Sequence, residues 1–242
     1  MAFSHGAIAK LYANGYDLSP YLQQVTLGGS TEPGDVTAIG QTTTPFYRSY
    51  ISGPVIGEAS ADGLFDGTTT VPAIDKVMND ALGLVGGSVV SYLPVGDGFG
   101  YYGYGLLADE TKYDVQTVAT AVAKSSAAMR SSSGMERAVI ACALAQKSST
   151  SAGSNIDNTS GTTNGGVGYL QVTAVTGSNG GTVLIQHSTN NADWSTLVTF
   201  VASTAISAQR VAVTGTVNRH IRASWTIGAT SSLTILAMFC RK

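Results

Sequence analysis

The stretch "GEASADGLFDGTTTVPAIDKVMNDALG", Gly57 to Gly83, contains the one strong helix pattern of this chain. Its apolar residues recur at spacings of three and four, on one face of a helix with 3.6 residues per turn: Ile74, Val77, Met78, Ala81 and Leu82. Thr70 is a candidate N-cap, Pro72 suits the first turn, and Gly83 suits the left-handed position after the helix. We therefore predict a short helix whose apolar face lies on a sheet.

Outside this helix, glycine, asparagine, proline and aspartate divide the chain into short segments rich in β-branched and aromatic residues. Examples are "YLQQVTL" at 21–27, "SVVSYLP" at 88–94, "TVLIQHS" at 182–188 and "HIRASWTI" at 220–227. The alanine-rich stretch 115–132 permits a helix or a strand, and the alternation of Ala119, Ala121 and Ala123 favours a strand. The sequence predicts a mainly β protein.

A change of composition at 147–166, "KSSTSAGSNIDNTSGTTNGG", indicates either an interdomain linker or a long loop of the second domain. The segments that follow are joined by turn sequences such as "GSNGG" and "STNNAD", which predicts an antiparallel β-sandwich of the jelly-roll or immunoglobulin-like kind. We place an N-terminal domain at 1–133 and a C-terminal β-sandwich domain at 134–242, with the boundary between 130 and 166. We assign "AVIACALAQ" at 138–146 to the sandwich, because it can pair with the terminal "LTILAMFCR".

The charge of the chain is low and unevenly divided. Charged residues make up 12% of the 242 residues, against about 25% in a usual globular domain, which fits a subunit that contacts copies of itself. The formal net charge of −2 argues against a protein that grips nucleic acid. Residues 1–147 carry 13 acidic and 8 basic side chains, whereas 148–242 carry 2 and 5, so the two parts have net charges of −5 and +3.

No targeting or membrane segment is evident from the sequence. The N-terminal "MAFSHGAIAKLYANG" has no basic segment followed by an apolar core, so we read no secretory signal and expect assembly in a cytoplasm. The apolar run "AVIACALA" is far shorter than the ~20 residues of a membrane span, and we expect no membrane insertion. Cys142 and Cys240 lie in apolar runs and are expected to be buried free thiols, with a disulfide between them as the alternative.

Three carboxylates, Glu58, Asp62 and Asp66, lie among glycines ahead of the helix. No histidine or cysteine lies near them to complete an acid–base site, and their spacing is not that of a calcium loop. An Asp followed by Gly is typical of a turn, because the Asp side chain bonds its own backbone. We predict that these carboxylates, with Gly63 and Gly67, form a strand-to-helix joint and catalyse nothing.

The stretch "GFGYYG" at 98–103 fits the dinucleotide pattern G-x-G-x-x-G. That pattern works only where the glycine turn opens a helix whose amides receive a pyrophosphate, and "YGLLADETKYDV" after it is not helical. We predict no cofactor. The stretch is interpreted as a loop in which Tyr101, Tyr102 and Tyr104 offer contact area to a neighbouring subunit.

The histidines and tryptophans also give no sign of chemistry. His5, His187 and His220 are isolated in the sequence, and we predict no metal site. Within "HIRASWTI" the alternation places Trp225 on the core face. We expect Trp194 to be buried as tryptophans usually are, with a sugar-stacking platform as the alternative. The sequence therefore predicts no enzyme.

The order of several segments resembles the major tail tube protein of long-tailed bacteriophages. In that family a "D-x-S-x-Y-L" opening leads through a "T-x-x-G" segment to "G-x-F-D-G" and a short helix. The corresponding residues here are Asp17, Ser19, Tyr21, Leu22, Thr37, Gly40, Gly63, Phe65, Asp66 and Gly67. One departure is "YISGPVIGEASADG" at 50–63, which has more glycine and proline than the usual extended strand. Residues 165–227 resemble the β-sandwich domain appended to many such proteins.

This resemblance implies a structural virion protein. Its N-terminal β-sandwich or barrel, with one flanking helix, would join five copies of itself in a hexameric ring, and stacked rings would form a tube through which the genome passes. Other tail proteins would meet the tube ends, and DNA would pass without specific binding, since a lumen without basic residues does not hold phosphates.

The resemblance also implies a place for the C-terminal domain, on the tube exterior. Its positive charge makes Arg219 and Arg222 candidates for weak contact with anionic polymers of the host surface, and a passive sandwich is the alternative. Two other classes of function are a carbohydrate-binding adhesin and a capsid decoration protein.

Overall fold

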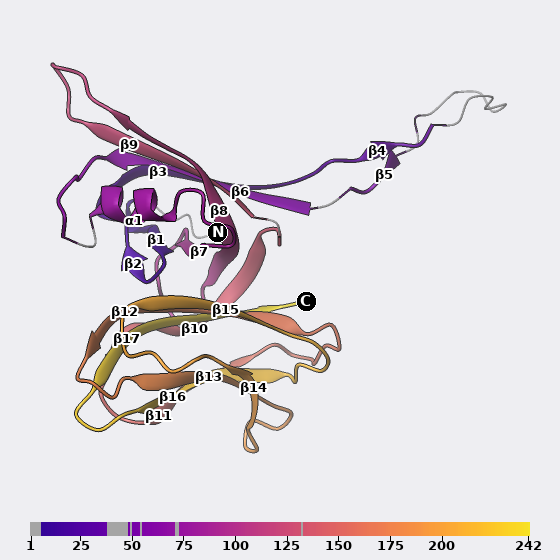
Figure 1. Ribbon diagram of the computed structural model, residues 1–242. Helices are drawn as coiled ribbons and strands as arrows, with labels where there is room; N and C mark the ends of the chain where they lie inside the picture. The colour runs from indigo at the N-terminus through magenta and orange to yellow at the C-terminus, as the bar shows by residue number, and fades with distance from the viewer. Residues whose placement is uncertain (1–5, 38–47, 49, 54, 71–72, 132) are drawn as a thin grey trace.

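The computed structural model describes residues 6–37, 48, 50–53, 55–70, 73–131 and 133–242, and His5, Gly40 and Pro72 lie outside them. The described chain is mainly β, its paired strands are antiparallel, and α1 (Ile74–Ala81) is the α-helix among them (Figure 1). This confirms the fold class expected from the sequence.

The elements follow one another in two groups. Before residue 133 the structure has η1 (Gly6–Ile8), β1 (Lys10–Ala13), β2 (Tyr16–Asp17), β3 (Leu22–Thr31), β4 (Gly34–Asp35), β5 (Tyr50–Ile51), β6 (Val55–Leu64), α1, β7 (Ser88–Leu93), β8 (Tyr102–Gln116) and β9 (Lys124–Ser131). After it come β10 (Glu136–Lys147), β11 (Ser151–Asp157), β12 (Gly166–Thr176), β13 (Gly181–Ser188), β14 (Ser195–Thr199), β15 (Ser207–Val213), β16 (His220–Ile227) and β17 (Ser232–Arg241).

These elements stack in layers from one side of the molecule to the other (Figure 1). The first layer is the sheet β3-β6-β9-β8, followed by α1 with β1, β2 and β7. The third is β15-β12-β17-β10, and the last is β11-β16-β13-β14. Strand β8 links the layers, because its first half pairs with β7 and β10 and its second half pairs with β9.

Helix α1 forms where the apolar periodicity predicts it, but its ends differ from the prediction. The N-cap is Ala73, which makes no side-chain capping bond, and the carbonyl of Thr70 accepts the Ala73 N–H in the turn before it. Leu82 is 42% exposed because its backbone has left the helix, with φ −60° and ψ 121°. Gly83 has a φ of +79°, as predicted. The buried residues of the helix are Ile74, Val77, Met78 and Ala81.

Two segments of ambiguous sequence are resolved as strands. In the alanine-rich stretch the strand is β9, which begins at Lys124, whereas Ala119 and Ala121 are exposed in the connection before it. The polar stretch 147–166 is neither a linker nor a plain loop, since β11 forms within it and pairs with β16. Its small polar residues suit a strand that is open to solvent on one face.

Strand β6 contributes only small residues to the core beneath the first layer. On β6 the residues that face inward are Gly57, Ala59, Ala61 and Gly63, and the residues between them face outward. Ala127 and Met129 of β9 join the same core. Small side chains on the sheet let α1 and β1 pack closely against it.

The C-terminal sandwich has a larger core between its two sheets. Phe200 and Ile185 are fully buried there, and Trp225 is buried as the alternation predicts. Strand β10 pairs with β17, for example Val139 with Phe239, which confirms the pairing expected for 138–146. Strand β10 therefore lies beside the C-terminal strand in one sheet of the sandwich.

A third core joins the two parts of the chain. Tyr12 and Val89 of the first part pack with Tyr169 of the second. Gln171 of β12 lies in the same contact: its side-chain oxygen accepts the Gly15 N–H at 2.8 Å, and its amide donates to the Val89 carbonyl at 3.0 Å. Because this core crosses it, the division at 133/134 stays a prediction.

A buried ionic cluster lies within the second part of the chain. Glu136 of β10 accepts two hydrogen bonds from Arg210 of β15, at 2.8 and 2.9 Å, and a hydrogen bond from the Tyr169 hydroxyl. The Lys242 ammonium lies 3.1 Å from the same carboxylate. Burial acts to raise the pKa of Glu136, but the hydrogen bonds from Arg210 and Tyr169 outweigh it and hold the pKa below its ordinary value.

Candidate assembly surfaces

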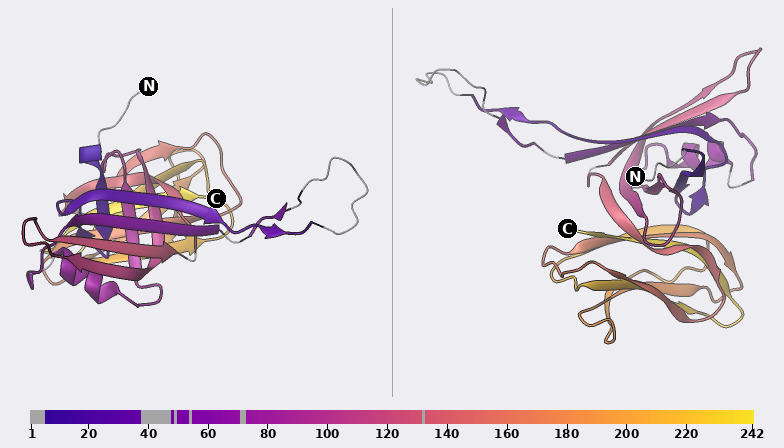
Figure 2. Two further views of the ribbon diagram at one scale, coloured as in Figure 1. Left: turned by 90° about the horizontal axis from the view of Figure 1, so that it is seen from above. Right: turned by 180° about the vertical axis from the view of Figure 1, so that it is seen from behind.

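The first layer leaves one face of its sheet uncovered. In the view from above, the strands β3, β6 and β9 cross the front of the molecule with nothing over them (Figure 2). The side chains that this open face presents include Gln24, Thr26, Glu58, Ser60, Asp62, Lys112, Asp114, Lys124, Ser126 and Arg130. We call it the polar face.

The polar face carries both basic and acidic side chains. Glu58 is paired with Arg130 at 3.0 Å, and Lys112 is paired with Asp114. Asp62 and Lys124 complete the set, and neither has an ion-pair partner among the described residues. The face is therefore nearly neutral in charge.

The residues expected at the strand-to-helix joint lie in two places. Glu58, Asp62 and Gly63 are inside β6, because the strand continues to Leu64. Asp66 and Gly67 lie in the connection that leads to α1.

Hydrogen bonding and close packing shape this joint. The Asp66 carboxylate accepts the Thr68 N–H at 3.0 Å, and this bond lowers the pKa of Asp66. A Cβ at Gly63 would lie 2.2 Å from the Tyr21 carbonyl, so only glycine fits there. Asp66 and Gly63 therefore both have structural roles: Asp66 bonds the backbone of the connection to α1, and Gly63 allows close packing against Tyr21.

Strand β3 is a long edge strand, and no other strand of the described chain covers its outer edge. It pairs only with β6 in the described part of the chain. Its ten residues, LQQVTLGGST, include no charged residue and no proline. Natural edge strands usually carry such residues, because unpaired backbone groups recruit other strands. An edge of this kind is suited to pairing with another chain.

The opposite edge of the same sheet is the second half of β8. Residues 111–116 pair with β9 on one side, and the described residues place no strand on the other. Nearer the centre of the strand, the Glu110 carbonyl accepts the Gly83 N–H at 3.3 Å. The sheet is thus open at both sides, which allows the same edge-to-edge contact to repeat from copy to copy.

An arm extends from this sheet well beyond the body of the molecule. Strands β3 and β6 run outward together, and β4 pairs with β5 farther along (Figures 1 and 2). Val36, Tyr50, Ile51 and Val55 of the arm are 47% to 58% exposed. Apolar side chains gathered on a projection favour contact with another molecule.

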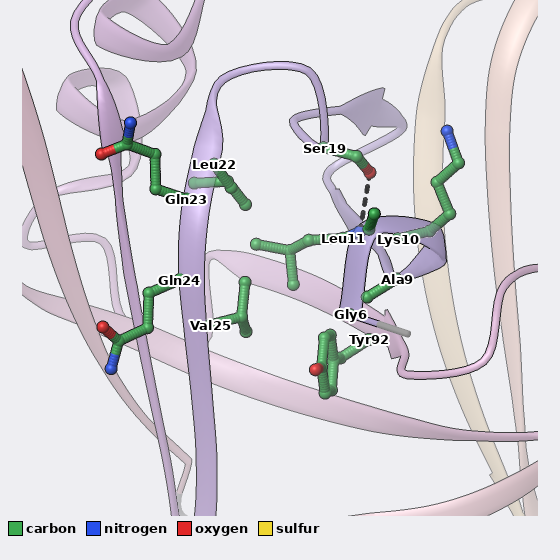
Figure 3. A pocket seen from close by; sticks show the side chains of 11 residues that line it. Gly6, Ala9, Lys10, Leu11, Ser19, Leu22, Gln23, Gln24, Val25 and Tyr92 are labelled. Atoms are coloured by element: carbon green, nitrogen blue, oxygen red, sulfur yellow. Dashed lines mark hydrogen bonds between the residues drawn. The ribbon is translucent and has the colours of Figure 1, made fainter. Parts of the chain in front are cut away.

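A hollow of about 390 Å³ lies beside the start of β3. Leu11, Leu22 and Val25 point into it, with Tyr92 at its far end, and the Ser19 hydroxyl accepts the Leu11 N–H at 2.9 Å (Figure 3). Among the described residues, its lining contains no carboxylate, histidine or cysteine. Because Lys10, Ser19, Gln23 and Gln24 also line it, the hollow is suited to receiving both apolar and polar side chains of a neighbour at the β3 edge.

The tyrosines of "GFGYYG" lie at the hairpin between β7 and β8. These strands are antiparallel, so the stretch is not the parallel strand–helix turn of a dinucleotide site. Tyr101 and Tyr102 are about half exposed and Tyr104 is partly buried. The Arg137 guanidinium lies 4.4 Å from the centre of the Tyr102 ring.

The two arginines chosen as surface contacts differ in their surroundings. Arg219 forms two hydrogen bonds of 2.6 Å with Asp157, which neutralises its charge. Arg222 lies 4.1 Å from the centre of the Trp194 ring and donates to Gln186 at 2.9 Å. Trp194 is half-buried on the sandwich surface, so the expectation of a core position is wrong.

One buried carboxylate was missed by the sequence reasoning. Glu110 is 2% exposed, and neither of its carboxylate oxygens has a hydrogen-bond partner among the described residues. Burial raises its pKa to about 8. Strand β8 has a bulge between Glu110 and Lys112, which interrupts the alternation of inward and outward side chains along the strand. Sequence alternation therefore does not predict that Glu110 points inward.

No metal or membrane site was found in the part of the chain that the structure describes. There, no three His, Cys, Asp or Glu side chains lie close enough to hold a metal ion. None of the helices described is long and apolar enough to cross a bilayer. Cys142 and Cys240 are buried free thiols, as expected from their apolar surroundings.

Comparison with known proteins gives partial likenesses. No family model and no curated protein matches the chain. The virion of a native gene transfer agent particle contains a chain with 17% identity and a TM-score of 0.41, over 56% of this chain and 98% of that one. The tail of an empty gene transfer agent particle, refined with C6 symmetry, contains a chain with 17% identity and a TM-score of 0.40. That alignment covers 55% of this chain and 97% of that one.

The crystal structure of the SPP1 Dit protein, titled a paradigm of the hub adsorption apparatus in phages that infect Gram-positive bacteria, gives 12% identity and a TM-score of 0.38. That alignment covers 97% of this chain and 100% of Dit. TM-scores below 0.5 are too low to carry a function from any of these proteins to this chain.

Proposed function

We propose that the chain is a structural subunit of a bacteriophage tail tube. Six copies would form a ring, stacked rings would form the tube, and the genome would leave through it. The order of the tail-like sequence segments supports this proposal. The observation that carries it is the ten-residue edge of β3, which is uncharged and unpaired in the described chain.

Edge pairing gives a ring a simple construction. The β3 edge of one copy would pair with residues 111–116 of β8 in the next, and the sheet would continue around the ring. Such a contact joins two different surfaces, and it closes when the rotation between copies divides a full turn. The hollow beside β3 would receive apolar side chains of the neighbour, and Tyr101, Tyr102 and Tyr104 are further candidate contacts.

The polar face would line the channel. Two of its three basic side chains are held by carboxylates, so they are less available to DNA phosphates. The arms, with their exposed apolar residues, would reach neighbouring subunits. This arrangement would let DNA pass without specific binding.

The C-terminal sandwich lies on the opposite side of the molecule from the polar face (Figure 1). In the tube it would project from the exterior, where weak attachment to host polymers becomes possible. A carbohydrate-binding adhesin or a capsid decoration protein remains the alternative class. Neither explains why the β3 edge is left unprotected.

Negative-stain electron microscopy of the purified full chain tests the proposal. We expect rings and hollow rods of uniform width. Closed rings that never stack would support the edge contact but contradict the tube. Monomers at high concentration, over a range of salt, would contradict the proposal as a whole.

A further inference from the structure

The outward face of the last layer carries a row of polar side chains across all its strands. Asn155 of β11 is opposite Arg222 of β16, Arg222 is opposite Gln186 of β13, and Gln186 is opposite Thr196 of β14. Directly opposed residues point to the same face of a sheet. Ile221 and Ala223, which precede and follow Arg222 in β16, point into the core. Arg222 and the rest of the row therefore face away from the core.

Arg222 is held in place without losing its charge. Its guanidinium stacks on Trp194 at 4.1 Å, and its Nε donates to Gln186 at 2.9 Å. It forms no ion pair with any described carboxylate, whereas Arg210 is paired with Glu136 and Arg219 with Asp157. The two terminal nitrogens of Arg222 are therefore left to bind something else.

A guanidinium fixed in this way is suited to one kind of ligand. Its planar fork matches the paired oxygens of a carboxylate or phosphate, and stacking and the Gln186 bond already restrict its orientation. Asn155 and Thr196 add neutral hydrogen-bonding groups on either side. Neighbouring strands are about 4.8 Å apart, so the row spans roughly 14 Å, the reach of a few sugar units.

We propose that this row binds an anionic polyhydroxylated polymer, with an acidic group on Arg222 and hydroxyl groups along Asn155, Gln186 and Thr196. The inference that this row lies on the tube exterior rests on the proposed function, whereas the inference that it binds such a polymer does not. The face is turned away from the polar face (Figure 1), so tube assembly would leave it open to a cell envelope. Arg219 takes no part, because Asp157 occupies it.

Binding of the full chain to three polymers tests this inference: a polyuronate, a poly(glycerol phosphate) and neutral dextran. We expect saturable binding to one or both acidic polymers that weakens with salt, and none to dextran. The polyuronate and the poly(glycerol phosphate) distinguish a carboxylate from a phosphate ligand. Arg222→Lys keeps the charge but loses the fork, and should weaken binding about tenfold.

Two further variants protect the test. Trp194→Leu should also weaken binding, because it frees the guanidinium, whereas Arg219→Ser should leave binding unchanged. The inference would be overturned if the Arg222→Lys and Trp194→Leu proteins bound the acidic polymers as tightly as the native chain does. It would also be overturned if the native chain bound dextran as tightly as the acidic polymers, or bound neither acidic polymer. Microscopy of the same preparations shows whether rods form, so a failure of the tube proposal is recognised separately.

Discussion

The sheet β3-β6-β9-β8 and the C-terminal sandwich treat their edges in different ways. Strand β3, with ten uncharged residues, pairs with β6 on one side and with no strand on the other in the described chain. In the sandwich the edge strand β14 has only five residues, and the Gln209 side chain bonds both backbone groups of Val201 just after it, at 2.8 and 2.9 Å. Short edges and covered backbone groups are how proteins avoid unwanted pairing.

The two regions also differ in their exposed apolar residues. Most of the large exposed apolar side chains lie before residue 123, on the arm, the hairpin tips and the helix end. In the sandwich only Val201 and Ile206 are of this kind among the described residues. The sandwich thus buries what it needs to bury within one copy, whereas the first sheet is completed by other copies in our account.

The largest expected effect separates two helix residues that the sequence pattern treats alike. Met78→Asp buries an unpaired charge, which costs several kcal/mol and should abolish folding. Leu82→Asp should fold with nearly unchanged thermal unfolding, because Leu82 is exposed. Circular dichroism melts of both proteins check this. An equal loss of structure in the Met78→Asp and Leu82→Asp proteins would contradict the exposed position of Leu82.

The next effect concerns the buried ionic cluster of Glu136, Arg210, Tyr169 and Lys242, which lies within the second part of the chain. Arg210→Met leaves the buried Glu136 with less compensation and should destabilise the protein by about 3 kcal/mol in urea unfolding. Arg219→Met removes an arginine of the exposed pair with Asp157 and should change little. A similar loss of unfolding free energy in both variants would show that the buried cluster stabilises the protein no more than the exposed pair does.

The pH dependence of the same cluster has a definite sign. The folded-state pKa of Glu136 is lowered, so its stabilising contribution is present above the ordinary carboxyl pKa and is lost as pH falls through the folded value. We therefore expect the penalty of Arg210→Met to shrink in acid. A penalty that is constant with pH would contradict this reading.

Glu110 predicts the opposite pH dependence. Its folded-state pKa of about 8 lies above its ordinary value, so the native chain loses stability as pH rises from about 4.5 to beyond 8. Glu110→Gln removes this loss, and its stability advantage should grow with pH to at most about 5 kcal/mol. Urea unfolding of both proteins between pH 5 and 9 measures the difference. Parallel profiles would show that Glu110 is not buried as described.

Sequence periodicity predicts those parts of the fold that depend on local alternation. The helix face, the burial of Trp225 and the pairing of 138–146 with the C-terminal strand were all accessible in this way. The position of Leu82 was not, because the helix ends one residue earlier than the apolar pattern. The third core was also hidden, since Tyr12 and Tyr169 meet only through tertiary packing.

The candidate surfaces were less accessible than the fold. The absence of charge in Leu22–Thr31 is visible in the sequence, but its meaning depends on the strand being an edge. The tyrosines and arginines were selected by composition, and only the structure separates Arg222, which has no acidic partner, from Arg219, which is paired. Surface chemistry depends on which segments lie side by side, and sequence spacing does not reveal that.

The central claim, that copies join through the β3 edge, is tested by one pair of substitutions. Thr26→Lys places a charge on β3, and Thr199→Lys places the same charge on the edge strand β14, where the native residue is also an exposed threonine. Sedimentation velocity of both variants and the native chain measures assembly directly. We predict that the native chain and Thr199→Lys assemble, while Thr26→Lys stays monomeric with unchanged thermal unfolding. Assembly of Thr26→Lys to the native extent would contradict the account.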